Sequence, residues 1–174
     1  MMTDGDVFTP HPWSVADHIF TVKGRAGQTT VATLRDGALA KLLAAAPDLL
    51  YAVEESKACL KREEKRLMED SEQQEVFAEQ LAVSNAWKAA DLAIAAARVG
   101  RANSATQERP LWTVNPKLPD SEREANKCLL AAAEDLWDAA MKAFPILARR
   151  DPEYAAVVAL LCAAMLRSGR VLPR

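Results

Sequence analysis

The chain has 174 residues, half of them hydrophobic and 26% charged, which is the balance of a globular protein able to bury one compact core. Its net charge of −2 gives no general attraction to nucleic-acid phosphates and is far from the dense acidic surface of a DNA mimic. Residues 1–6 lack the basic start of a signal peptide, and the longest apolar run, 154–166, is shorter than the roughly 20 residues that span a bilayer. We therefore expect a cytoplasmic protein without a membrane partner.

A β-hairpin is expected near the N-terminus. Residues 18–23 and 29–34 are rich in β-branched side chains, and a connection containing two glycines and Arg25 separates them. Because a lone hairpin is marginally stable in water, one of its faces should pack on helices. Arg25 would then lie at the exposed turn, where another molecule can reach it.

Helical periodicity begins after the hairpin. Asp36 is a suitable N-cap for a helix with leucines on one side, and Pro47 either starts a second helix or kinks a continuous one. The stretch Lys61–Arg66 is charged all round, with opposite charges three and four residues apart. We expect residues 61–70 to form an exposed, projecting helix end.

Three further helices are expected in the second half of the chain. Ser71 and Ser121 each open a capping box, and the helix after Ser71 carries an apolar stripe, which Phe77 and Leu81 widen, before it stops at Gly100. Asp151 followed by a proline predicts the start of the last helix. That helix is apolar nearly all round, which is typical of a helix at the centre of a bundle.

Residues 101–120 are the one long irregular connection. Its three prolines forbid a regular helix, and its apolar residues, including Trp112, can pin it to the helical body. Loops of this length inside a compact domain are often functional. Arg101, Arg109 and Trp112 are therefore candidate contacts with a partner.

The run Leu42-Leu43-Ala44-Ala45-Ala46-Pro47-Asp48-Leu49-Leu50 resembles a segment common in small bacteriophage accessory proteins. In those proteins a short β-hairpin precedes a helix with the pattern Leu-Ile-Ala-Ala-Ala-Pro-Asp/Glu-Leu-Leu, usually introduced by Ala-Asn-Ala. The asparagine is missing here, and the resemblance covers roughly residues 13–55. It implies a phage or prophage protein that acts in the cytoplasm of the host cell.

Paired acids raise the alternative of metal-dependent nucleotide hydrolysis. All-α nucleotide pyrophosphohydrolases carry Glu-Glu-x-x-Glu on one helix and Glu-x-x-Asp on another, so that acids one turn apart converge on Mg²⁺. In this chain Glu55 is followed three residues later by Ala58, and Glu134 by Trp137, so neither spacing is complete. The acids alternate with lysine and arginine, which predicts a solvated helix face. We expect no catalytic residue, no metal ligand and no cofactor.

The three cysteines also give no sign of a reactive or metal site. Cys59, Cys128 and Cys162 are more than thirty residues apart and lie in alanine- and leucine-rich surroundings. We expect them to be reduced, small apolar side chains.

The sequence therefore predicts a mainly α protein, a helical bundle of four to five helices with a small N-terminal β-hairpin. Residues 1–35 would form the N-terminal segment and hairpin, and residues 36–174 the bundle, packed together as one unit. The expected function is binding to a host protein or protein complex, including inhibition of a host defence system such as CRISPR interference (an anti-CRISPR protein). Partner-binding candidates are Arg25, Arg101, Arg109 and Trp112. A nucleotide hydrolase, or a nucleic-acid-binding or structural phage component, are the alternatives, and the alanine-rich faces also allow a homo-oligomer.

Overall fold

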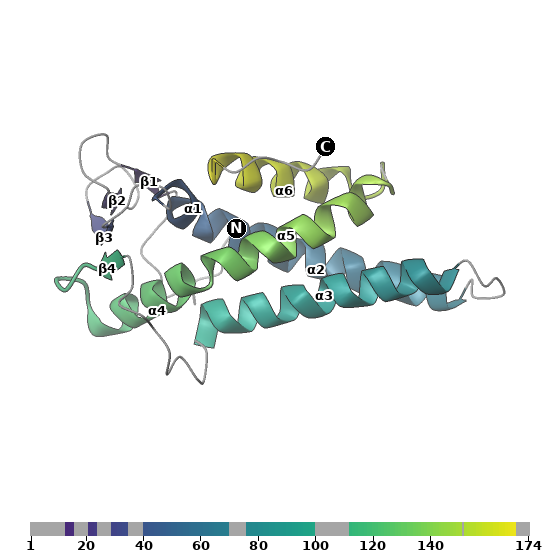
Figure 1. The fold of residues 1–174 in the computed structure, drawn as a ribbon, viewed down its shortest axis with the longest axis horizontal. Coiled ribbons are helices and arrows are strands. Elements are labelled where there is room, and N and C mark those ends of the chain that lie inside the picture. The colour runs from purple at the N-terminus through teal and green to yellow at the C-terminus, as the bar shows by residue number, and fades with distance from the viewer. Residues whose placement is uncertain are drawn as a thin grey trace.

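A computed structural model gives the fold of the protein. It describes residues 13–15, 21–23, 29–34, 40–69, 76–99, 112–150 and 152–169. The described part is mostly helical, with a small antiparallel sheet at one end of a long helical body (Figure 1), as the sequence predicts. Among these residues there is no helix both long and apolar enough to cross a membrane.

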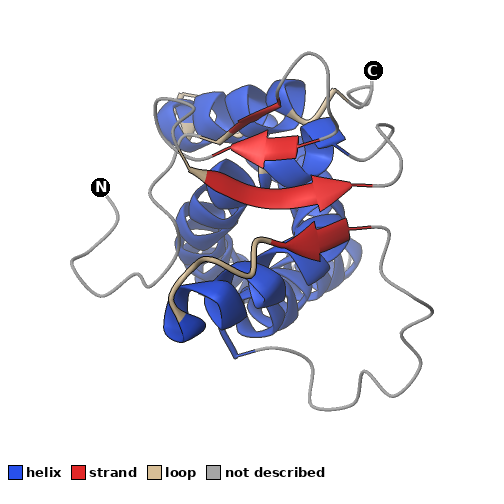
Figure 2. Ribbon diagram, turned by 90° about the vertical axis from the view of Figure 1, so that its left-hand side faces the viewer, coloured by secondary structure: helices blue, strands red, loops and turns tan. Residues whose placement is uncertain are grey.

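The sheet has four strands in the order β1-β2-β3-β4, and Figure 2 shows them side by side across the end of the helices. Their bounds are Ser14–Val15, Thr21–Lys23, Thr30–Leu34 and Trp112–Val114. The antiparallel pairing of β2 with β3 confirms the predicted hairpin. Strand β4 corrects the expectation of a wholly irregular connection up to residue 120. Its place beside β3 is fixed by Asn115, whose backbone N–H donates to Val31 at 2.9 Å and whose side-chain amide donates to Thr30 at 2.8 Å.

A helical hairpin forms the long axis of the molecule. A short helix, α1 (Ala40–Ala44), leads into α2 (Ala46–Glu69), and α3 (Val76–Val99) runs back along it (Figure 1). Pro47 lies in the first turn of α2, where a helix does not need the N–H that proline lacks. Pro47 therefore starts a second helix, which was one of the two expected outcomes.

The remaining helices are α4 (Asp120–Ala131), α5 (Ala133–Ala148) and α6 (Ala155–Arg167). The described residues thus hold six helices, where four to five were expected. The higher number includes α1, which is only one turn long, and counts α4 and α5 separately, because a turn at Ala132 divides them. Pro145 lies inside α5 without ending it. The capping box predicted at Ser121 is wrong: α4 begins at Asp120, with Pro119 at the N-cap and no side-chain capping hydrogen bond. The N-cap therefore lies two residues earlier than the capping box predicts, at a proline whose fixed φ suits the residue before a helix.

The expectation of a central last helix is also wrong. Helix α6 packs on α2 and α5 by one face, which includes Leu161 and Met165, and it leaves the other in solvent. Leu166 is 63% exposed. The outward positions include four exposed alanines, at 155, 156, 159 and 163. An exposed alanine costs little, so counting apolar residues overestimates the burial of such a helix.

The core lies between the helices and reaches the sheet. Its largest fully buried side chains are mainly leucines of α2, α4 and α5, and the cluster also includes Trp13, Val22 and Val31 from the N-terminal strands and their approach. The three cysteines carry no disulfide. Cys59 is buried, and the other two are half-buried.

Candidate interaction surface on helix α3

Of the four partner-binding residues predicted from the sequence, the structure describes one. Arg25, Arg101 and Arg109 lie outside the described residues, as does the capping box at Ser71. Trp112 lies in β4 opposite Leu34, half-buried and packed against the core. Its burial is that of a residue which fixes β4 to the body.

The prediction of an exposed charged helix end at residues 61–70 is wrong for the side of α2 that faces the other helices. Glu63 is only 1% exposed and accepts a hydrogen bond from the Tyr154 hydroxyl at 2.8 Å. Its carboxylate also lies 3.3 Å from both Arg66 and Arg150, and Arg150 reaches Glu79 of α3 at 3.0 Å. This network joins α2, α3 and the segment between α5 and α6. Burial and the hydrogen bond to Glu63 raise the pKa of Tyr154 above its ordinary value.

Two further acids of the helical hairpin are also engaged between helices. Glu54 of α2 pairs with Arg98 of α3 at 2.7 Å, and Asp91 of α3 pairs with Lys57 of α2. The hydrogen bond from Lys57 holds the pKa of Asp91 below its ordinary value. Within the described ranges, no three histidine, cysteine or acidic side chains are grouped so that they could hold a metal ion.

Helix α3 packs on its neighbours through a line of small side chains. The buried positions along it are Val83, Ala86, Ala90, Ala93 and Ala97, each no more than 2% exposed. Their spacing of three and four residues keeps them on one face, against α2, α4 and α5. Alanines here let the helix axes approach closely.

The large apolar side chains of α3 lie on the opposite face and are exposed. Phe77 is 71% exposed, Leu81 52%, Leu92 74% and Val99 84%. At about 100° per residue these four positions fall within about 60° of one another and point away from the alanine line. The sequence predicted that Phe77 and Leu81 widen the buried stripe of α3, and this prediction is wrong. They begin a second stripe, the outer face of α3, which we define by Phe77, Leu81, Leu92 and Val99.

Charged side chains of α3 leave this outer face nearly free of charge. Glu79, Asp91 and Arg98 make the ion pairs with Arg150, Lys57 and Glu54, which lie beside or behind the helix. Lys88 is the charged residue on the outer face itself, and its ammonium lies 5.8 Å from the centre of the Trp87 ring. The outer face thus carries large apolar side chains in two groups, Phe77 with Leu81 and Leu92 with Val99, and Ser84 and Lys88 lie between them.

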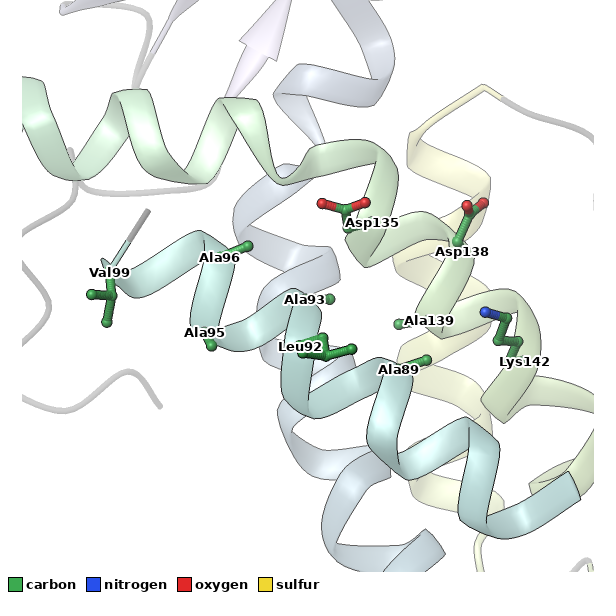
Figure 3. Close-up of a pocket in the computed structure, with 10 residues that line it drawn as sticks. All are labelled: Ala89, Leu92, Ala93, Ala95, Ala96, Val99, Asp135, Asp138, Ala139 and Lys142. Carbon is green, nitrogen blue, oxygen red and sulfur yellow. The ribbon is translucent and has the colours of Figure 1, made fainter. Parts of the chain in front are cut away.

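A groove of about 630 Å³ runs beside the outer face, between α3 and α5. Figure 3 shows alanines of α3 and Ala139 of α5 along its floor, with Leu92 on the α3 side and polar residues on α5. The polar residues are Asp135, Asp138 and Lys142. The groove adjoins the outer face at Leu92 and Val99, and the two together form an apolar surface with a charged border on the α5 side.

Sequence reasoning missed this surface because both faces of α3 are apolar, so periodicity alone does not say which one is buried. The available signal was side-chain size: one stripe is almost all alanine, and the other carries Phe, Leu, Leu and Val. No protein-family model, curated protein or solved structure matches the chain.

Proposed function

We propose that this chain acts by binding another protein chain, and that the outer face of α3 is the surface on which it does so. The observation that carries the proposal is the inversion of α3, which buries alanines and exposes Phe77, Leu81, Leu92 and Val99. A helix that carries large apolar side chains on a face is normally covered on that face. Exposed apolar patches of this kind are typical of interaction sites.

The energetics favour a protein partner. Burying a large apolar side chain gains about 1.5–3 kcal/mol relative to leaving it in water, so four of them supply up to about 12 kcal/mol, which is comparable to the cost of about 4–15 kcal/mol for the freedom lost on association. From Phe77 to Val99 the stripe is about 33 Å long, at 1.5 Å per residue. An elongated apolar stripe suits a helix of another chain better than it suits a compact small molecule.

The segment 42–50 gives the proposal its biological setting. Its resemblance to bacteriophage accessory proteins, together with a hairpin placed before it, supports a role in the host cytoplasm against a host defence system such as CRISPR interference. On this proposal the protein inhibits by occupying a surface of a defence protein, without chemistry of its own.

A pair of charge substitutions tests the proposal. Leu81→Glu with Leu92→Glu places two carboxylates on the outer face, and Ala159→Glu with Ala163→Glu adds the same charges to exposed positions of α6 as a control. Each protein is expressed in bacteria with active CRISPR interference, the efficiency of phage plating is measured, and the defence proteins that co-purify are quantified.

We expect the wild type and the α6 control to raise plating at least tenfold and to retain a defence protein. The α3 variant should do neither while keeping its melting temperature. A folded α3 variant that inhibits and binds as well as the wild type would overturn the assignment of this surface.

A further inference from the structure

Seven positions of α3 share the direction of the outer face, and the spacing of these positions is the same in both chain directions. Positions 77, 81, 84, 88, 92, 95 and 99 follow one another in steps of four, three, four, four, three and four. The series is therefore symmetric about Lys88. Two repeats of eleven residues produce it, and eleven residues fill three helical turns almost evenly, so the stripe stays on one side of a nearly straight helix.

We propose that a second copy of this chain docks on the outer face, with the two α3 helices antiparallel and a two-fold axis passing beside Lys88. This inference rests on the proposed function: the second copy covers the outer face in the free protein, and a host protein that binds there displaces it. A two-fold axis requires a patch that complements itself. In the symmetric register, residue i faces residue 176 − i of the other copy, which follows from the axis at position 88.

Side-chain sizes are complementary in that register. Phe77 faces Val99, and Leu81 faces Ala95 of the second copy. Leu92 faces Ser84. Each large side chain thus meets a smaller one, which is the alternation that allows two helical surfaces to interdigitate. A parallel arrangement would instead place Phe77 on Phe77 and Ala95 on Ala95.

At the axis Lys88 faces Lys88 of the second copy, and the nearby Asp91, which also pairs with Lys57, supplies opposite charge. Lys88 is the charged residue on the outer face, and Asp91 lies one turn further along the edge of α3 with 54% of its side chain exposed. A two-fold axis at Lys88 puts two lysines and two aspartates within one turn of one another. The long lysine side chains can extend toward the aspartates, so like charges do not face one another unscreened.

The size of the contact is sufficient. The four large side chains expose roughly 500 Å² of apolar surface on each copy, so pairing two copies covers about 1,000 Å² before the flanking residues are included. Specific protein interfaces begin at about this size. Exposed apolar side chains of this extent would promote aggregation if they stayed open, whereas a two-fold contact closes them in a defined dimer.

Cysteine cross-linking tests both the dimer and its direction. In a chain with Cys128→Ser and Cys162→Ser, we would introduce Lys88→Cys or Ala95→Cys singly and oxidise each protein. We expect Lys88→Cys to give a covalent dimer, because that position faces itself, and Ala95→Cys alone to give none. Mixing the Ala95→Cys protein with a Leu81→Cys protein should restore cross-linking.

Light scattering supplies the second measurement. The wild type should have twice the 19.0 kDa mass of the chain at micromolar concentration, and the Leu81→Glu and Leu92→Glu variant half of that value. Cross-linking of Ala95→Cys alone as efficiently as Lys88→Cys would overturn the antiparallel register. A wild type that stays monomeric at 100 times that concentration would overturn the dimer.

The two proposals fail in different ways. In one outcome the wild type is monomeric, and the Leu81→Glu and Leu92→Glu variant no longer retains the defence protein. This outcome supports the proposed function and refutes the second copy as occupant of the outer face. A dimer that dissociates in this variant while inhibition persists supports the second copy and places the host contact elsewhere.

Discussion

Replacing Glu63 with glutamine should lower the free energy of unfolding by about 2 kcal/mol. Glutamine preserves the volume of this buried side chain and can still accept the hydrogen bond from Tyr154. It cannot supply the negative charge that lies 3.3 Å from both Arg66 and Arg150. The substitution therefore separates the electrostatic part of the network from its packing.

The magnitude follows from the exposure of the partners. Removing one member of a fully buried ion pair costs about 3–5 kcal/mol, because the other charge stays buried without compensation. Here the arginines are partly solvated, with 45% of the Arg66 side chain and 28% of the Arg150 side chain exposed. Water can therefore replace part of the lost interaction, and we reduce the cost to about 2 kcal/mol.

Urea denaturation followed by far-ultraviolet circular dichroism provides the measurement, at one fixed protein concentration for all variants. The control is Glu55→Gln, at an exposed position of the same helix, which should change the free energy of unfolding by less than about 0.5 kcal/mol. If Glu63→Gln is as stable as this control, the carboxylate does not hold the helices together and the reasoning is refuted.

Three further outcomes are expected. Ala90→Leu on the buried face of α3 should lower the free energy of unfolding in urea by about 2 kcal/mol, because the close packing there has no room for the larger side chain. The control Ala131→Leu, at an exposed site, should change this free energy by less than about 0.5 kcal/mol. Equal effects of the two substitutions would contradict the assignment of the faces of α3. The raised pKa of Tyr154 contributes stability that is fully present below the tyrosine pKa of the unfolded chain, about 10, and is lost as the pH rises above that value. In urea titrations between about pH 9 and 11, Tyr154→Phe should therefore lose less stability than the wild type. Parallel stability curves for the two proteins would contradict a contribution from the ionisation of Tyr154. Gly169 has a φ of +70°, so Gly169→Ala should cost about 1 kcal/mol in thermal unfolding, and an unchanged midpoint would show that the turn relaxes.

Local signals predicted the elements whose causes are local. Periodic leucines and alanines marked the helices, and the glycines between two β-branched runs marked the hairpin. Pro47 indicated either the start of a helix or a kink through a property of proline itself, and the structure has the start of α2 there. In each case the residues that decide the conformation lie within a few positions of the element that they form.

Features that depend on distant partners escaped prediction. Three residues of β4 carry too little pattern to identify a strand, and its pairing partner β3 lies on the far side of two long helices in the sequence. Glu63 looked solvated because its neighbours are charged, and only the fold brings Tyr154 to it. For α3 the pattern showed two apolar faces, and the choice between them is made by α2, α4 and α5.

The position of β4 has a consequence for the order of folding. Strands β3 and β4 are neighbours in the sheet, yet the whole α2–α3 hairpin is inserted between them in the chain. Bringing these two strands together before the hairpin forms would carry the entropy cost of closing a very long loop. Strand β4 should therefore pair with β3 after the rate-limiting transition state of folding. Substitutions that weaken β4 should then raise the unfolding rate and leave the folding rate nearly unchanged.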